Sequence, residues 1–265
     1  MSETFLTKIL SHKAEEVARQ VVKVPMAALE ERIGRAPAPR DFAAALRRPG
    51  ATALIAEVKK ASPSRGVLLE SFDHLALART YIEGGAAAIS VLTDVRFFQG
   101  SLKFLEAIRQ LPGAPPLLRK DFIIDPYQVY EARAYGADAL LLIVAALDDA
   151  QLRDLLALTG DLGMQALVEV HDEAELDRAL AVGAPVVGVN NRDLHSFHIS
   201  LDTTARLARL LPEGGGRPAL VSESGIFTPA HVAQARAIGA DAVLVGEALV
   251  TSPDTLAQVR ALVAA

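Results

Sequence analysis

The sequence contains no cysteine among its 265 residues. Disulfide bonds, zinc–thiolate centres and thiol nucleophiles are therefore excluded. Because disulfides belong mainly to oxidising compartments, a chain without cysteine fits a cytoplasmic location, which we expect here.

The chain also lacks an excess of basic residues and any long apolar run. Lys and Arg number 27 against 32 Asp and Glu, so the formal net charge is −5 and no nucleic-acid partner is expected. The longest apolar run, 139–147, is about half of the roughly 20 residues that span a bilayer. The N-terminal residues have no basic segment of the kind that opens a signal peptide, so neither membrane insertion nor secretion is expected.

Nucleotide-loop and metal motifs are missing too. Neither GxxxxGK[ST] nor GxGxxG occurs, which argues against the common nucleotide-binding loops. His195 and His198 lie close in sequence, but no acidic partner has a convincing spacing for a metal site. We therefore expect no metal.

An internal repeat is the main positive feature of the chain. Four segments begin with glycine, follow an Ala-rich amphipathic stretch and continue into an apolar run, which is typical of a helix end leading into a buried strand. The four segments are Gly84–Leu92, Gly136–Val144, Gly183–Asn190 and Gly239–Gly246.

Four further apolar stretches bring the expected strands to eight. They are Ala53–Val58, Pro116–Arg119, Met164–Val170 and Pro218–Ser222. The strand starts are roughly 20–35 residues apart, as strand-plus-helix units require, and near-continuous apolar strands indicate a sheet covered on both faces. We predict one α/β domain over residues 1–265, a (β/α)8 TIM barrel; a doubly wound open sheet is the alternative.

Residues 1–48 precede the first strand and are expected to form a helical extension packed on the barrel. An apolar stripe predicts a first helix, and Asp41 is placed to cap a short helix over 42–48. The stripe consists of Leu6, Ile9, Leu10, Val17, Val21 and Val22.

Polar residues gather where the expected strands end, the position at which such barrels carry their chemistry. Glu57 and Lys59 point to the same side because side chains alternate along a strand. Other strand ends carry Arg119–Phe122, Glu169, Asn190–Asp193, Ser222–Gly225 and Gly246–Glu247. A single such residue is more often part of a structural ion pair or a turn, but several lysines and glutamates at one rim indicate an active site.

The last two strand-to-helix loops suggest a phosphate site. Ser224–Gly225 and Gly246–Glu247 place glycine where a backbone can approach a ligand, and the loops after strands seven and eight commonly bind phosphate through amide groups. The Glu247 side chain must then point away from the phosphate. The fourth strand stays apolar and would offer an apolar wall.

Six segments together resemble the indole-3-glycerol phosphate synthase family. They occur in the family's order and cover about residues 50–250, and the N-terminal helical extension also fits the family. The segments are Ile55–Ser64, Ser90–Asp94 with Phe97–Gly100, Leu118–Ile123, Leu167–Val170, Gly188–Leu194 and Ser222–Ile226. The resemblance implies ring closure of 1-(2-carboxyphenylamino)-1-deoxyribulose 5-phosphate, with loss of carbon dioxide and water and without a cofactor.

The resemblance also implies roles for the catalytic residues. Lys120 would be the general acid, and Lys59 would hold the substrate carboxylate and be a candidate donor in the dehydration. Glu169 would be the base of the dehydration, Glu57 would orient the lysines and contact hydroxyls, and Asn190 would hydrogen-bond the substrate.

The remaining implied contacts are with the substrate. Phe122, with Leu142 and Leu244, would line the aromatic pocket, and Arg192 and Glu223 would also touch substrate. Ser62, Ser224, Gly225, Gly246 and Glu247 would bind the phosphate, although the family often has Ser or Thr at the place of Glu247. A mobile loop, Pro63–Gly66, would cover the mouth with Arg65 as a clamp.

Three other functions remain open. A phosphoribosylanthranilate isomerase-like barrel would share the phosphate loops but require a thiol or carboxylate acid–base pair. A Schiff-base aldolase would use Lys120 as a nucleophile, and a non-catalytic phosphate-sugar binding protein would need neither Lys120 nor Glu169. We expect a phosphorylated small-molecule substrate and a monomer.

Overall fold

The computed structural model describes residues 4–63, 65–69, 71–193, 198–212, 214 and 216–265. Eight parallel strands form a closed barrel, in the ring order β1-β10-β9-β8-β7-β6-β5-β4. They are β1 (Ala53–Val58), β4 (Ala88–Leu92), β5 (Leu117–Lys120), β6 (Ala139–Ile143), β7 (Gln165–Val170), β8 (Val186–Asn190), β9 (Ala219–Glu223) and β10 (Ala242–Val245). The predicted (β/α)8 barrel is confirmed, and the open-sheet alternative is wrong because β10 pairs with β1.

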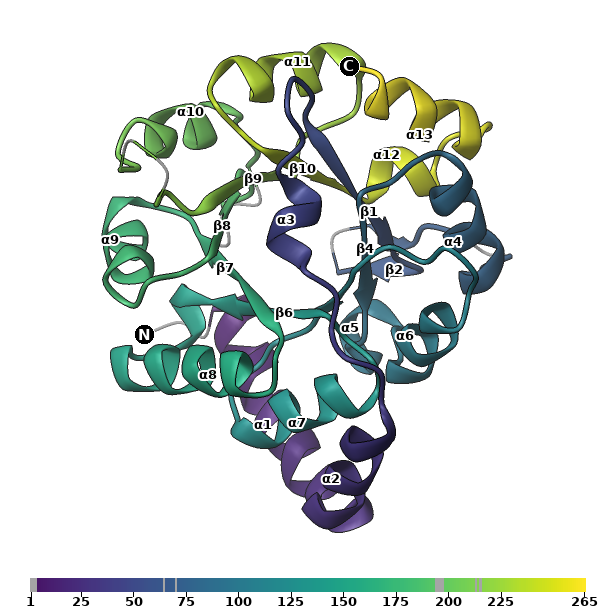
Figure 1. Ribbon diagram of the computed structural model, residues 1–265, viewed down its shortest axis with the longest axis vertical. Helices are drawn as coiled ribbons and strands as arrows, with labels where there is room; N and C mark the ends of the chain where they lie inside the picture. Colours follow the sequence, from purple (N-terminus) through teal and green to yellow (C-terminus); the bar gives the residue numbers. More distant parts are fainter. Residues whose placement is uncertain (1–3, 64, 70, 194–197, 213, 215) are drawn as a thin grey trace.

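Helices surround this ring (Figure 1). The main ones are α4 (His74–Glu83), α6 (Leu102–Arg109), α7 (Pro126–Ala134), α8 (Asp149–Asp161), α9 (Glu173–Ala181), α10 (Asp202–Ala208), α11 (Pro229–Ala237) and α13 (Thr255–Val263). Shorter turns are α5 (Val95–Phe98), η1 (Val144–Ala146) and α12 (Glu247–Val250). Side-chain caps start many of them: Asp73, Asp125 and Asp172 each accept a hydrogen bond from a first-turn amide.

Strand register decides which side chains point into the barrel. In β6 and β7, Leu141 lies opposite Leu167 and Ile143 opposite Glu169. Paired residues of neighbouring parallel strands share a face, so these four point inward. Leu142, between them, belongs to the apolar layer under the outer helices.

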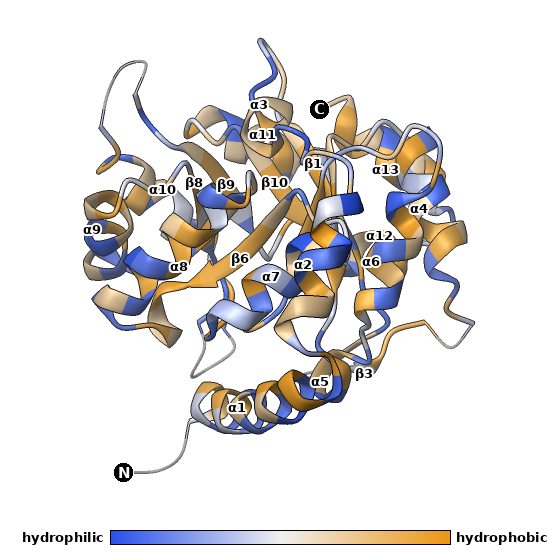
Figure 2. Cartoon of the chain, turned by 60° about the horizontal axis from the view of Figure 1, so that its bottom comes forward, coloured by the Kyte–Doolittle hydropathy of each residue, from blue (hydrophilic) through white to orange (hydrophobic). Residues whose placement is uncertain are grey.

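The extension of residues 1–48 contacts both ends of the barrel. Helix α1 (Phe5–Lys23) lies across one end beside α5 (Figure 2), with the rings of Phe5 and Phe97 5.9 Å apart. Helix α2 (Met26–Arg35) follows it, and α3 (Phe42–Leu46), capped by Asp41, packs on the first residues of the strands at the opposite end.

The predicted apolar stripe of α1 is only partly correct. Ile9 and Val17 are buried, but Val21 and Val22 are exposed near the C-terminal end of the helix. The buried face contains Lys13, which is 1% exposed and pairs with Asp94 and Asp121, each at 2.9 Å. An ion cluster therefore fixes α1 in addition to apolar packing.

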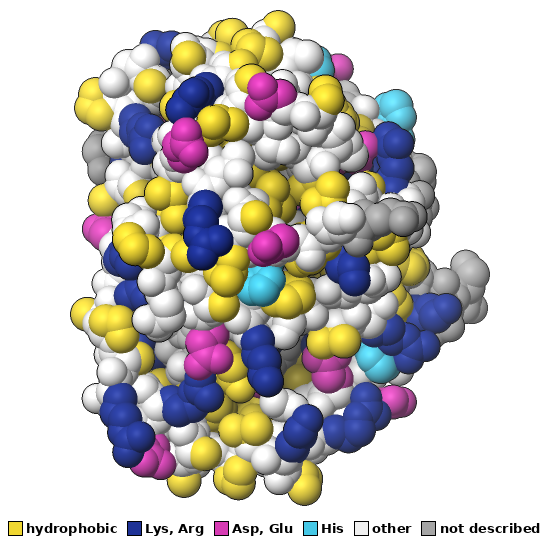
Figure 3. Space-filling model, turned by 90° about the vertical axis from the view of Figure 1, so that its right-hand side faces the viewer, with side chains coloured by type: hydrophobic (Ala, Val, Ile, Leu, Met, Phe, Trp, Pro, Cys, Tyr) yellow, Lys and Arg dark blue, Asp and Glu magenta, His cyan; other side chains and the backbone are white. Residues whose placement is uncertain are grey.

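Three smaller features complete the description of the fold. The loop after β1 forms an antiparallel hairpin of β2 (Ala61–Ser62) and β3 (Gly66–Val67), and its residue 64 lies outside the described residues. On the face seen in Figure 3, basic and acidic side chains are interspersed. Within the described ranges, no helix has the length and apolar character needed to cross a membrane.

Candidate active site

One cavity opens at the C-terminal ends of the strands, and fourteen of the predicted site residues line it. These residues are Glu57, Lys59, Ser62, Lys120, Phe122, Glu169, Asn190, Arg192, Glu223, Ser224, Gly225, Leu244, Gly246 and Glu247. The barrel therefore brings together side chains that lie up to 190 positions apart in the sequence, from Glu57 to Glu247.

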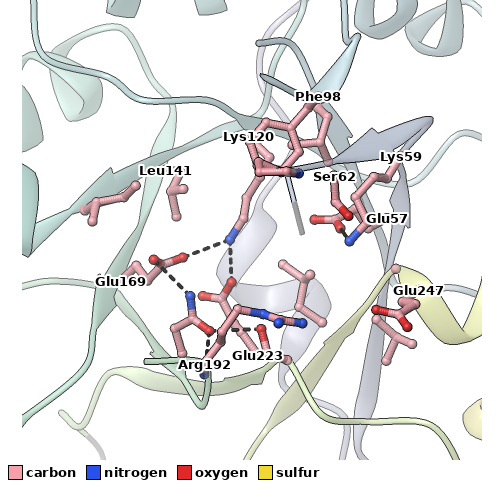
Figure 4. Close-up of a pocket in the computed structure, with 18 of the residues that line it drawn as sticks. Glu57, Lys59, Ser62, Phe98, Lys120, Leu141, Glu169, Arg192, Glu223 and Glu247 are labelled. Carbon is pink, nitrogen blue, oxygen red and sulfur yellow. Dashed lines mark hydrogen bonds and ion pairs between the residues drawn. The ribbon is translucent and has the colours of Figure 1, made fainter. Parts of the chain in front are cut away.

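Lys120 is the centre of the site (Figure 4). Its Nζ donates to Glu169 Oε2 at 3.0 Å and also to Glu223 Oε2. The three side chains come from β5, β7 and β9, and all are largely buried. Gly188 makes room for this group, because a Cβ there would collide with the Glu223 carboxylate.

Charge and burial shift the pKa values of all three groups. Burial alone would lower the pKa of Lys120, but the carboxylates of Glu223 and Glu169 raise it above its usual value. For Glu169 burial acts upward, yet Lys120 and His171 hold its pKa below the ordinary range. Burial, against the effect of Lys120 and with the neighbouring charge of Glu169, raises the pKa of Glu223 to about 7. The group thus combines a stable ammonium, an ionised carboxylate and a carboxyl that titrates near neutrality.

A second ion pair faces the first across the cavity. Lys59 Nζ lies 2.7 Å from Glu57 Oε1, as expected from their alternation at the end of β1. Gly246 is required here for a reason that the sequence did not reveal: a Cβ at this position would collide with the Glu57 carboxylate.

Asn190 connects the group of Lys120, Glu169 and Glu223 to the last loops. Its Nδ2 donates to Glu169 Oε1 at 3.2 Å, while its Oδ1 accepts from the Ser224 hydroxyl at 2.9 Å and the Arg192 amide at 3.1 Å. Ser224 and Gly225 both have positive φ, at 63° and 84°, which turns the loop sharply after β9.

The predicted phosphate end is also part of the cavity. Ser62, Gly225 and Gly246 line it, and Glu247 begins α12. The Glu247 side chain pairs with Arg65 at 2.7 Å, so this arginine is linked to the rim through an acid.

The apolar wall differs from the prediction in one residue. Leu244 and Phe122 line the cavity, but Leu142 does not, because its position on β6 points it at the outer helices. Leu141 and Ile143 of the same strand line the cavity instead. The register of β6 with β7, which places Ile143 opposite the inward Glu169, decides which β6 side chains face the cavity.

Several features of the site were not predicted. Phe5, Leu6 and Ile9 of α1 line the cavity, as does Phe98 of α5, whose ring lies 6.3 Å from that of Phe122. His171, just after β7, lies with its Nε2 3.5 Å from Glu169 Oε1. Neither the helical stripe nor a lone histidine in a loop carries a signal for these contacts.

A metal site is not evident in the part of the chain that the structure describes. No group of three or more His, Asp or Glu is arranged to hold an ion there, and His195 lies outside the described residues.

Solved structures with low sequence identity share the fold. The 3-hexulose-6-phosphate synthase from Salmonella typhimurium superposes with a TM-score of 0.62 at 15% identity, over 80% of this chain and 97% of that one. The thiamine phosphate pyrophosphorylase from Pyrococcus furiosus gives 0.61 at 16% identity, over 79% and 93% of the two chains. These similarities concern the barrel alone.

Sequence relatives are far closer. Indole-3-glycerol phosphate synthase from Roseiflexus sp. (strain RS-1) is 68% identical over 265 residues, covering 98% of both chains. The protein of the same name from Aromatoleum aromaticum is 51% identical over 260 residues, covering 97% of this chain and 98% of the relative. The family profile described as indole-3-glycerol phosphate synthase matches residues 6–262, and the chain therefore belongs to the indole-3-glycerol phosphate synthase family.

Proposed function

We propose that the cavity carries out the chemistry of this family with Lys120 as the general acid. The enzyme is a carboxy-lyase of tryptophan biosynthesis, which converts 1-(2-carboxyphenylamino)-1-deoxyribulose 5-phosphate into indole-3-glycerol phosphate. The ring carbon that bears the carboxylate attacks the ribulose carbonyl, carbon dioxide leaves, and water is then lost. The observation that carries the assignment of roles is the position of Lys120 between Glu169 and Glu223.

Lys120 has the properties required of the proton donor. Its raised pKa keeps it an ammonium at neutral pH, and it faces the cavity in which the carbonyl oxygen would be bound. As the new carbon–carbon bond forms, that oxygen becomes more basic and takes the proton. Decarboxylation then restores the aromatic ring without a further proton transfer.

Glu169 serves as the base of the dehydration. Its lowered pKa keeps it ionised, and Lys120 and Asn190 hold both of its oxygens toward the cavity. Loss of water removes one proton from carbon and gives one to the departing hydroxyl. Glu169 takes the first, and Lys59 or Lys120 supplies the second.

The surrounding residues bind and orient the substrate. Lys59 holds the carboxylate and is itself oriented by Glu57. Asn190 hydrogen-bonds the substrate and supports Glu169, and Glu223 and Arg192 contact the sugar part. Phe122 and Leu244, together with Leu141 and Ile143 in place of Leu142, enclose the aromatic ring.

The substrate phosphate is assigned to the end of the cavity formed by the loops after β9 and β10. Ser62, Ser224, Gly225 and Gly246 bind it through hydroxyl and amide groups, with the amide of Glu247 at the start of α12. The pairing of the Glu247 carboxylate with Arg65 supports this, since it directs the acid toward a cation at the rim. The loop that carries Arg65 is proposed to close over the bound substrate.

The remaining properties are proposals about the whole protein. We infer a single domain that works as a cytoplasmic monomer without metal or cofactor, with the phosphorylated substrate as its main partner. Contacts with other enzymes of the pathway would be weak and transient.

An indole-fluorescence assay tests the activity directly. Purified protein should form indole fluorescence from the carboxyphenylamino ribulose phosphate without added metal or cofactor. Absence of fluorescence with authentic substrate would contradict the proposal. Borohydride treatment in the presence of a carbonyl substrate tests the aldolase alternative, because a Schiff base between lysine and substrate would be reduced to a covalent adduct, which would favour the aldolase.

A further inference from the structure

His171 is a buried titratable residue to which the proposed chemistry gives no role. It follows β7, its side chain is 14% exposed, and it does not appear among the described residues that line the cavity. One acidic neighbour of His171 is Glu169, which lies two residues earlier in the sequence, on β7. The other is Glu175 in the first turns of α9.

The hydrogen bonds of His171 assign its ring nitrogens. Glu175 Oε2 lies 2.9 Å from Nδ1 and also accepts the His171 backbone amide at 2.8 Å. A carboxylate oxygen can only accept, so Nδ1 carries a proton. The other nitrogen, Nε2, is buried without a hydrogen-bond partner and is directed at Glu169 Oε1, 3.5 Å away.

The charges along this line alternate. Glu175, His171, Glu169 and Lys120 follow one another, each in contact with the next, and Glu223 completes the group on the far side of Lys120. A protonated imidazole is therefore flanked by acids on both sides. Burial alone would lower the pKa of His171, but its hydrogen bond to Glu175 and the charges of Glu169, Glu175 and Glu223 raise it.

Glu169 needs a second, permanent positive charge nearby when Lys120 donates its proton. Two carboxylates share one ammonium before donation, and they face a neutral amine afterwards. Glu169 is nearly fully buried, so it cannot rely on water to remain ionised at that moment. Without another positive charge its pKa would rise, and it would cease to be the base that the dehydration requires.

We propose that His171 is the positioning residue that supplies this charge: as an imidazolium anchored by Glu175, it keeps Glu169 ionised and directed at the cavity. This inference rests on the proposed role of Glu169 as the base. No bond to carbon is made or broken by His171, which acts only through Glu169. Lys120 can change its charge during turnover, whereas His171 lies behind Glu169 and keeps its own.

The activity test uses His171→Asn in the full-length protein. Asparagine can still donate to Glu175 but carries no charge, so the pKa of Glu169 should rise. We expect the acid limb of the kcat profile to move upward by about one pH unit or more, as for loss of an opposite charge within about 4–6 Å. KM should change little, and kcat should approach the wild-type value at high pH, where His171 of the wild type is also neutral.

If His171 only stabilised the fold, its substitution would change the kcat profile in a different way. If kcat of His171→Asn falls by the same factor at every pH, or if the acid limb does not move, the proposal is wrong. His231 on α11 offers a control, since its ring accepts a hydrogen bond from the Phe227 amide but contacts none of these acids. The variant His231→Asn should leave the kcat profile unchanged.

A measurement that does not depend on turnover separates this inference from the proposed function. Nitrogen-15 NMR of the ligand-free protein should show both ring nitrogens of His171 protonated at pH 7, with Glu169→Gln and Glu175→Gln each lowering the titration midpoint. The His171→Asn spectrum assigns the signal, and Glu175→Gln provides a second variant if His171→Asn does not fold. A neutral His171 at pH 7, or a midpoint insensitive to both changes, would overturn the proposal even in a fully active enzyme.

Discussion

Lys120, Glu169 and Glu223 form a group in which each side chain sets the protonation of the others. One ammonium between two buried carboxylates holds one acid ionised, while the other titrates near pH 7. Their separate substitutions should therefore have different signatures.

Replacing Lys120 by alanine should lower kcat by at least about 10²-fold, the smaller end of the range for loss of a general acid. The change removes the donor and leaves Glu169 and Glu223 without their shared cation. Indole fluorescence under saturating substrate measures it, with Lys103→Ala on the exposed face of α6 as the control. Unchanged turnover would remove Lys120 from the mechanism.

Glu169→Gln should impair dehydration more than substrate binding. Glutamine keeps one acceptor oxygen in place of the two that receive Lys120 and Asn190, and it cannot accept the proton from carbon. Release of carbon dioxide and formation of indole should be followed separately in a single turnover, and we expect the second to slow far more than the first. Weakened substrate affinity with normal turnover would contradict this assignment.

Glu223→Gln should make stability less dependent on pH. Because the folded-state pKa of Glu223 is raised to about 7, the folded protein binds this proton more tightly than the unfolded chain does. Ionisation therefore costs stability as the pH rises from about 4.5 to 7, by roughly 3 kcal/mol for a shift of this size. Urea unfolding at pH 5 and pH 8 should show a smaller difference for the variant than for the wild type. An equal difference in both proteins would contradict the raised pKa.

At the scale of elements, α1 is attached to the barrel by charge as much as by apolar packing. Lys13 contacts Asp94 before α5 and Asp121 after β5, and Asp121 also pairs with Arg119 at 3.1 Å. The same helix carries Phe5, Leu6 and Ile9 of the cavity lining. Its placement therefore affects both stability and the shape of the cavity.

Lys13→Met should lower the free energy of unfolding by about 3–5 kcal/mol, because it removes the cation paired with the buried Asp94 and leaves Asp121 with Arg119 alone. Lys8→Met, an exposed position on the same helix, should have little effect. Urea denaturation of the two variants provides the comparison, and limited proteolysis within residues 5–23 should be faster for Lys13→Met. Equal stability of the two variants would show that the cluster contributes nothing to the attachment.

Elements with strong periodicity could be predicted, and elements defined by tertiary contacts could not. The helix ends at Gly84, Gly136, Gly183 and Gly239 located four strands, and alternation placed Glu57 and Lys59 on one face. Helix α2 and the burial of Lys13 depend on partners distant in sequence, whereas the hairpin is local but has only two residues in each strand. Leu142 was assigned to the wrong face because the phase of β6 is set by its register with β7.

At the scale of the whole molecule, closure of the barrel converts eight local signals into one site. Each strand end was identifiable from sequence, but the contact of Lys120 with Glu223, 103 positions later, exists only because β5, β7 and β9 lie on one ring. The family resemblance implied the roles of these residues, whereas the ion pairs between them could be seen only in the folded structure.

Acid should unfold the molecule through its buried ion pairs. The pKa of Asp121 is lowered by Lys13 and Arg119 against the opposing effect of burial, and that of Glu169 is lowered as well. A depressed folded-state pKa contributes stability above the unfolded value, near pH 4, and that stability is lost as the pH falls through the folded value. Circular dichroism at fixed temperature should show unfolding below about pH 4. Retention of full stability at pH 2 would contradict these pKa directions.

The single segment of residues 1–48 touches both ends of the barrel, and this has a consequence for biosynthesis. Lys13 leaves the ribosome long before Asp94 and Asp121, and α3 must wait for Ala242 of the last strand to complete its surroundings. The extension is thus translated first but can dock fully only when nearly the whole chain has emerged. The Lys13 ammonium therefore stays hydrated during that interval and loses its water only in the last stage of folding.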